Sequence, residues 1–182
     1  MNFLELPPRD AKTGLVNVVI DTPRGSRNKF KYDEDLGTFK LSRVLPEGHV
    51  FPFDFGSVPG TRAADGDAID VMVLLDQPTF AGCLVQVRLI GVLPARQSGF
   101  NRARKRKTVV NDRLLGVPQT KVNKPAVRSI AEVDPARIAH IQHFFVSYNE
   151  AQGRRFRPGR PLGPNAAEKR LREAIARFEK EG

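Results

Sequence analysis

Three carboxylates, Asp65, Asp67 and Asp70, fall within a span of six residues, and apolar strand-forming residues follow at once. In an extended chain Asp65 and Asp67 would point to one side and Asp70 to the other, because side chains alternate along a strand. Gly66 lies between the first two acids and permits backbone angles that other residues avoid. A turn at Gly66 would therefore bring all three carboxylates to the same side of the fold.

Such crowding is costly unless a cation offsets it. Two carboxylates about 4 Å apart repel each other by about 4 kcal/mol at an effective dielectric constant of about 20, and one of them would otherwise take up a proton. A divalent cation removes that cost, and ligand sets made only of oxygen suit Mg²⁺ or Mn²⁺. The sequence thus favours a metal site at 65–70, while a solvated Asp-Gly-Asp turn before a strand is the simpler alternative.

The composition is that of an ordinary globular protein. The chain has 182 residues, 40% of them hydrophobic, which suits one domain, residues 1–182, with a sizeable core. No apolar run approaches the roughly 20 residues that span a bilayer, and residues 1–8 lack the pattern of a secretion signal. Cys83 is the only cysteine, so no internal disulfide can form, and a reducing cytoplasm is the expected location.

The chain is strongly basic. A formal net charge of +10 favours anionic partners such as phosphates, nucleic acids or membrane surfaces. Much of this charge lies in a basic cluster at 102–107 and in the segment 154–160. Phe100 precedes the basic cluster but no aromatic residue interrupts it, so the cluster offers charge without stacking. We therefore expect no specific nucleic-acid binding, and any affinity should be lost as salt rises.

The remaining pattern, which must position the acids, is mainly that of strands. Runs of strand-forming residues lie at 14–21, 28–33, 36–44, 69–75, 83–93 and 114–117, with a hairpin formed by the second and third. Asp134 and Pro135 mark the start of one helix, and an amphipathic helix at 165–180 follows with Asn165 as its cap. Residues 94–112 are assigned no element. We expect an α+β fold, mainly β: a five-stranded OB-like barrel with two flanking C-terminal helices.

The string at 65–71, Asp-Gly-Asp-Ala-Ile-Asp-Val, resembles the signature of the soluble family I inorganic pyrophosphatases, which usually have Pro or Glu at the place of Ala68. Further segments resemble the family in the same order: 20–33, Arg43, the Phe-Pro-x-x-Phe-Gly-x-Val-Pro string at 51–59, the segment 111–118 and the His-Phe-Phe-x-x-Tyr string at 143–148. The resemblance covers residues 14–178. It implies the family's OB-like barrel and its reaction, the Mg²⁺-dependent hydrolysis of inorganic pyrophosphate to two phosphates.

The resemblance also implies roles for the matching residues. Two Mg²⁺ ions, which Mn²⁺ can replace, would be held by Asp65, Asp70 and Asp112, with Asp21 in the outer metal shell. Asp67 would accept the proton of the attacking water, whose pKa the metals lower. The phosphates would be bound by Lys29, Arg43, Arg113 and Tyr148. The implied partners are pyrophosphate, phosphate and further copies of the chain in a homo-oligomer, with no membrane.

Several positions depart from the family pattern. Lys31 stands where the family has Glu, and Arg113 stands where it has Lys. Phe51 and Phe55 replace two tyrosines, so their packing surface is kept while the hydroxyls are lost. A cation at position 31 repels a nearby metal ion, and we therefore expect fewer bound metals than in the family's fuller sites.

Two questions stay open at this point. A one-residue offset in the resemblance would put Asn111, rather than Asp112, at the metal. The lost site groups would also suit a degenerate pyrophosphatase-like protein that binds phosphate or nucleic acid without turnover, or a hydrolase of another phosphoanhydride.

Overall fold

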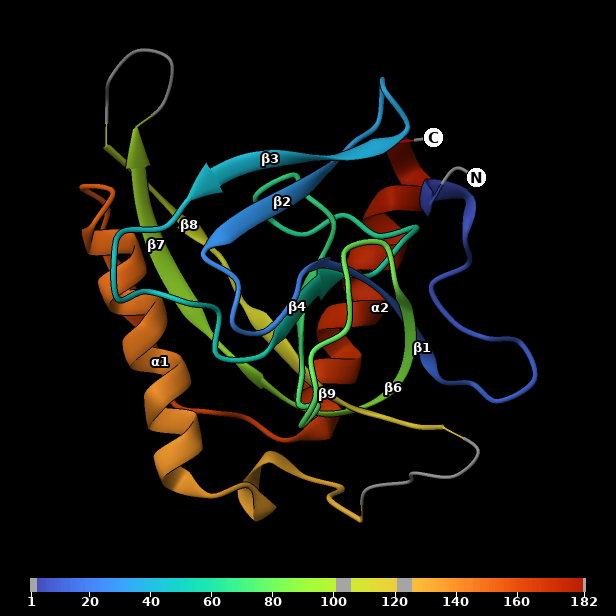
Figure 1. Cartoon of the computed structure of the whole chain (residues 1–182). Helices are drawn as coiled ribbons and strands as arrows, with labels where there is room; N and C mark the ends of the chain where they lie inside the picture. Colours follow the sequence, from blue (N-terminus) through green and yellow to red (C-terminus); the bar gives the residue numbers. More distant parts are fainter. Residues whose placement is uncertain (1–2, 101–105, 121–125, 182) are drawn as a thin grey trace.

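The computed structural model of the chain describes residues 3–100, 106–120 and 126–181. The basic cluster at 102–107 lies outside the described residues, except for the backbone of its last two members. In chain order the elements are η1 (Phe3–Glu5), β1 (Val16–Thr22), β2 (Asn28–Asp33), β3 (Thr38–Val44), β4 (Asp54–Ser57), β5 (Asp70–Val73), β6 (Leu84–Leu93), β7 (Ala95–Phe100), β8 (Arg106–Val110), β9 (Arg113–Pro118), η2 (Ile130–Glu132), α1 (Pro135–Glu150), β10 (Phe156–Pro158) and α2 (Pro164–Glu181) (Figure 1).

Five strands close into a barrel in the order β1-β4-β5-β9-β6, which confirms the expected OB-like barrel. β5 and β9 run parallel, and the other neighbours run antiparallel. Branched apolar side chains such as Val18, Val71 and Val92 are fully buried, and burial of such residues stabilises the closed sheet. Gly56 lets β4 approach β1, since a Cβ there would lie 2.2 Å from the carbonyl oxygen of Val19.

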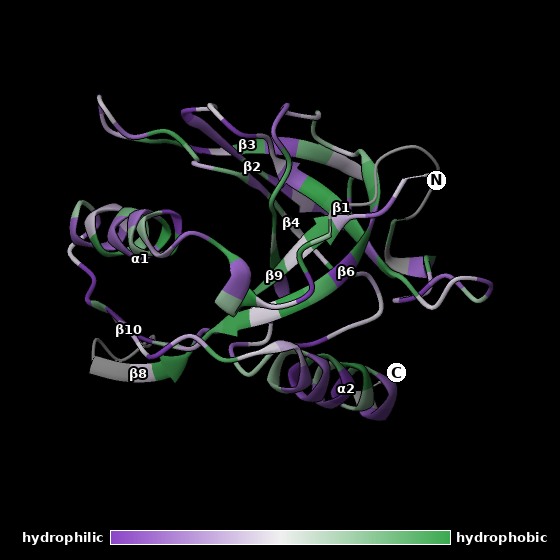
Figure 2. Ribbon diagram, turned by 90° about the horizontal axis from the view of Figure 1, so that it is seen from below, coloured by the Kyte–Doolittle hydropathy of each residue, from purple (hydrophilic) through white to green (hydrophobic). Residues whose placement is uncertain are grey.

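Two helices cover the barrel on different sides, as Figure 2 shows, which confirms the two flanking helices. α1 buries residues such as Ile141 and Phe145 in a cluster that includes Phe55 of β4. α2 buries Leu171 in a second cluster with Val92 of β6. Within the described parts of the chain, no helix combines the length and the apolar character needed to cross a membrane.

The starts of the two helices differ in how well the sequence predicted them. Asp134 caps α1 as expected, because its carboxylate accepts the N–H of Ala136 at 2.8 Å. The prediction that Asn165 caps the second helix is wrong, because α2 already begins at Pro164. Proline suits a first helical position because it needs no N–H donor there.

A small sheet of order β10-β7-β8 was missed in the sequence. β7 and β8 occupy the segment 94–112, where basic residues obscure any alternation of apolar and polar side chains. β10 joins them from beyond α1 and pairs Phe156 with Gln97. Because this pairing is long-range, no local pattern in the sequence predicts it.

Candidate functional site

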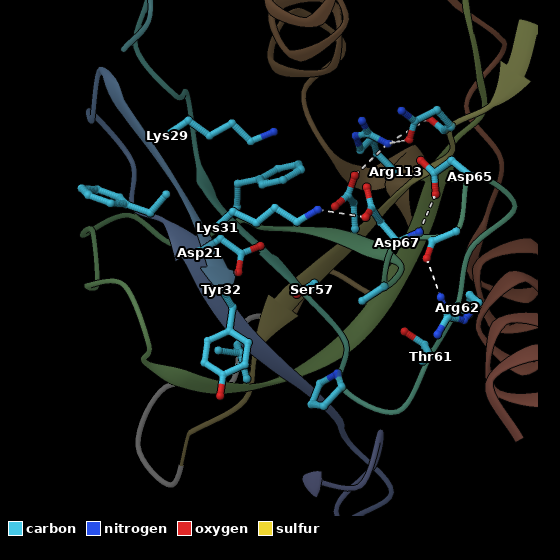
Figure 3. Close-up of a pocket in the computed structure, with 18 of the residues that line it drawn as sticks. Asp21, Lys29, Lys31, Tyr32, Ser57, Thr61, Arg62, Asp65, Asp67 and Arg113 are labelled. Carbon is cyan, nitrogen blue, oxygen red and sulfur yellow. Dashed lines mark hydrogen bonds and ion pairs between the residues drawn. The ribbon is translucent and has the colours of Figure 1, made fainter. Parts of the chain in front are cut away.

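A pocket of about 420 Å³ is lined by residues of the β2–β3 hairpin, the barrel strands and the end of α1 (Figure 3). Seven of the site residues predicted from the sequence line it: Asp21, Lys29, Asp65, Asp67, Asp70, Arg113 and Tyr148. Acids and cations from segments far apart in the chain therefore meet in one cavity.

Asp65, Gly66 and Asp67 lie in a tight turn just before β5. Gly66 has a φ of +97°, which confirms that the turn uses a backbone conformation suited to glycine. The N–H of Ala63 donates to the carbonyl oxygen of Asp67 at 2.7 Å and closes the turn. The turn thus presents Asp65 and Asp67 to the same pocket that Asp70 lines from the start of β5.

Asp21 lies at an irregularity in β1. The pairing of β1 with β4 skips Asp21 between Ile20 and Thr22, which is the register of a β-bulge. A bulge redirects a side chain that regular alternation would aim elsewhere, and Asp21 lines the pocket. Burial there, together with the nearby carboxylate of Asp70, raises the pKa of Asp21 to about 8.

Three of the pocket acids lie in surroundings that disfavour their charged form. Burial raises the pKa of Asp65 and of Asp70 above their ordinary values, as it does for Asp21. In the described parts of the chain, no three acidic, His or Cys side chains close around one point. Mg²⁺, however, is commonly held by one or two carboxylates together with waters and substrate phosphates. The acids of this pocket therefore fit a divalent cation that takes its other ligands from water and substrate.

Arg113 is a buried cation in the pocket wall. Its Nη1 lies 2.9 Å from Oδ2 of Asp70 and also donates to the side-chain oxygen of Asn111. Its guanidinium carbon lies 5.3 Å from the ring centre of Phe145 and 5.8 Å from that of Phe55. Its Nε is buried and has no hydrogen-bond partner among the described residues.

Lys29 projects from β2 between two aromatic rings. Its Nζ lies 5.8 Å from the ring centre of Phe55 and 5.8 Å from that of Tyr148. Both rings attract the ammonium group and hold it at the pocket. Phe55 therefore orients both Lys29 and Arg113 through its ring alone, which needs no hydroxyl.

Lys31, also on β2, reaches across to the turn that carries Asp67. Its Nζ donates to Oδ1 of Asp67 at 2.9 Å, and a dashed line in Figure 3 marks this ion pair. The two side chains are 59% and 67% exposed, so the pair lies at the mouth of the pocket. A cation of the chain is thus already bound to one of the three clustered carboxylates.

Asp112 does not enter the pocket. Its carboxylate accepts the N–H of Arg170 in α2 at 2.8 Å and the backbone N–H of Ala95 at 3.1 Å. Alternation explains this orientation, because Asn111 and Arg113 on either side of it line the pocket instead. The predicted role of Asp112 as a metal ligand therefore has no support from its position, and the open alternative, Asn111, occupies the pocket position.

Arg43 also lies outside the pocket lining. It is the cross-strand partner of Lys29, but its Nη1 donates to the side chain of Gln152 just beyond α1. In this arrangement the guanidinium of Arg43 is engaged outside the pocket, and the predicted contact with phosphate has no support from its position.

Several polar residues of the pocket were missed in the sequence, among them Gln97 and Arg154. Gln97 and Arg154 line it from β7 and from the segment after α1. The pairing of β7 with β10 brings those two segments together. Neither residue belongs to a motif, and only the basic composition of 154–160 gave a signal toward Arg154.

Comparisons with known proteins agree with this architecture. The family model described as inorganic pyrophosphatase matches residues 18–179. The chain is 38% identical to the inorganic pyrophosphatase of Geobacillus stearothermophilus over 164 residues, which cover 90% of this chain and 94% of that protein. It is 34% identical to that of Thermus thermophilus over 180 residues, 97% of this chain and 98% of that protein. A crystal structure of the inorganic pyrophosphatase from Thermus thermophilus superposes with a TM-score of 0.86 at 33% identity, covering 98% of this chain and 99% of that one.

Proposed function

This chain belongs to the inorganic pyrophosphatase family, and we infer that it hydrolyses inorganic pyrophosphate to two phosphates. Enzymes of this family are metal-dependent hydrolases, and the metal we propose here is Mg²⁺, which Mn²⁺ can replace. One observation carries the proposal for the site: Asp65, Asp67 and Asp70 face the same pocket as Lys29 and Arg113. The acids suit a metal and a proton acceptor, and the cations suit phosphate oxygens.

We assign the metal to Asp65 and Asp70, with Asp21 as an outer acid. When bound, the metal lowers the pKa of the attacking water and offsets charge on the phosphates. The raised pKa values of these three acids support the assignment, because burial disfavours their charged form and a bound cation would offset that cost. Asn111, and not Asp112, is the side chain of its segment that could add an oxygen ligand.

Asp67 accepts the proton of the attacking water in this proposal. Its side chain is 67% exposed, against 23% for that of Asp70, so water reaches it freely. Only its Oδ1 is bound in the ion pair with Lys31. An oxygen of the carboxylate is therefore left for a water proton.

The substrate phosphates are bound by Lys29, Arg113 and Tyr148. Lys29 is held between two rings, and Arg113 is fixed by Asp70 and by its aromatic contacts, so both charges are preorganised. Fixed cations of this kind stabilise the charge that develops on phosphate oxygens in the transition state.

The proposal is tested by the stoichiometry of the reaction. Purified protein with Mg²⁺ should release two phosphates for each pyrophosphate consumed, measured by a colorimetric phosphate assay. Phosphate release from a phosphomonoester under the same conditions serves as the control and should be negligible, because that substrate has no phosphoanhydride bond. Folded protein that releases no phosphate from pyrophosphate at any tested Mg²⁺ or Mn²⁺ level would overturn the proposal.

The changed assignment at 111–112 makes a separate prediction. Asp112→Asn keeps an acceptor for the N–H of Ala95 but loses the ion pair with Arg170. We expect the free energy of unfolding to fall by about 1–3 kcal/mol, while turnover of pyrophosphate stays within about threefold because Asp112 lies outside the pocket. Thermal unfolding and initial rates measure the two effects. A large loss of turnover with unchanged stability would return Asp112 to the metal site.

We further propose that the chain acts as a single domain, residues 1–182, in a cytoplasmic homo-oligomer. Leu36, Leu41 and Val44, on or beside the β2–β3 hairpin, are each more than half exposed, at 70%, 54% and 53%. Exposed apolar side chains of this kind support association between copies. The sole cysteine, Cys83, is free, which supports a reducing compartment. Light scattering of the purified protein measures the oligomer.

A further inference from the structure

The position of Lys31 sets this pocket apart from a simple cluster of acids. Its ammonium group donates to Asp67, and that hydrogen bond is the main cause that raises the pKa of Lys31. The negative charges of Asp70 and Asp21 act in the same direction. One side-chain cation is thus shared electrostatically by three of the acids that line the pocket.

A second ion pair on the same hairpin shows what is specific to Lys31. Lys40 is the cross-strand partner of Lys31 and binds Asp33, and the exposures of the two lysines are nearly equal, 59% and 58%. Neither Lys40 nor Asp33 lines the pocket. The two lysines therefore share the hairpin, have nearly equal exposure and each pair with an aspartate, and they differ in whether that aspartate lines the pocket.

We propose that Lys31 is a tethered counter-cation that takes the place of a divalent ion at Asp67. The inference rests on the proposed function, in which the pocket binds a metal at Asp65 and Asp70. Lys31 repels a divalent ion at Asp67 and binds the carboxylate oxygen that such an ion would use. It supplies its own positive charge beside the substrate in exchange, and the pocket binds fewer or weaker divalent ions as a result.

Arg113 cannot be exchanged for a metal in the same way. It is buried, with 8% of its side chain exposed, and it contacts two aromatic rings as well as Asp70. Removing it would leave Asp70 uncompensated in the pocket wall. Lys31 is flexible and exposed, so its removal frees Asp67 without disturbing the core. Replacement of Lys31 is therefore the change that tests how a cation of the chain affects metal binding.

The test is calorimetric titration with Mn²⁺ alone, without substrate, on the whole chain and on Lys31→Met. A unit charge about 4 Å from a divalent ion repels it measurably even in water, so the variant should bind Mn²⁺ roughly tenfold more tightly or take up an additional ion. Lys40→Met, the matched control, should bind Mn²⁺ as the unchanged chain does. Thermal unfolding in the absence of metal shows that both variants are folded.

A double variant locates the effect. In Lys31→Met combined with Asp67→Asn, the gain in Mn²⁺ binding should disappear, because the freed carboxylate is gone. Equal Mn²⁺ affinity and ion number in Lys31→Met and the unchanged chain would overturn the inference, as would an equal gain in Lys40→Met or a full gain that persists in the double variant. Phosphate release by the unchanged chain is measured separately, so failure of the proposed hydrolysis is distinguishable from failure of the inference about Lys31.

Discussion

Asp67→Asn should lower the turnover of pyrophosphate by about 10²-fold or more while the protein stays folded. The amide has the shape of the carboxylate but cannot accept the proton of the attacking water. Its ion pair with Lys31 lies at the surface, and exposed pairs of this kind contribute about 0–1 kcal/mol, so stability should hardly change. Initial rates of phosphate release at saturating Mg²⁺, together with thermal unfolding, measure both effects.

The matched control for this variant is Asp33→Asn. Asp33 also pairs with a lysine of the hairpin but lies outside the pocket, so its amide variant should keep nearly full turnover. Near-normal turnover in Asp67→Asn would show that Asp67 is not the proton acceptor. Equal losses in both variants would trace the effect to the hairpin rather than to the pocket.

Removal of divalent metal should abolish hydrolysis. Without it, Asp65 and Asp70 face the negative charges of pyrophosphate, and the attacking water keeps its high pKa. We expect the rate after treatment with a chelator and desalting to fall below about 1% of its initial value, and to return when Mg²⁺ is added. The same addition should raise the temperature of unfolding, because an ion that binds only the folded state stabilises it.

The control for metal removal uses chelator that is saturated with Mg²⁺ beforehand, which should leave the rate unchanged. Metal-free protein that hydrolyses pyrophosphate at its full rate would contradict the assignment of Asp65 and Asp70 to a metal. In that case the cations of the chain, Lys29, Lys31 and Arg113, would have to offset the substrate charge alone.

Two departures from the expected family pattern, Phe55 and Lys31, have a common physical effect on the charge of the pocket. Phe55 keeps the ring that holds Lys29 and Arg113 in place, so the loss of a hydroxyl leaves the two cations oriented. Lys31 adds a positive charge at an acid that would otherwise be free for a metal. Both changes keep positive charge at the pocket, which is what binding of a polyphosphate anion requires.

Local spacing along the chain determined the turn at 65–67 and the cap of α1. Gly66 between two aspartates specifies a turn through the backbone angles that glycine alone adopts readily, and the structure has that turn. Asp134 before Pro135 specifies a helix start through the hydrogen bond that the carboxylate accepts. In both cases the interacting groups are a few residues apart, so their geometry follows from the covalent chain.

The tertiary structure alone decided which side chains of β2, β9 and the segment before β9 meet the acids. Side chains alternate along a strand, so a shift of one residue moves a side chain from the pocket to the opposite face. Only the placement of β9 in the barrel turns Asn111 toward the pocket and Asp112 toward Arg170. Likewise Lys31 meets Asp67 because the hairpin folds over the barrel. The sequence by itself determined the residue types and the local turns, whereas pairings between distant segments depend on packing of the whole barrel, which no local spacing encodes.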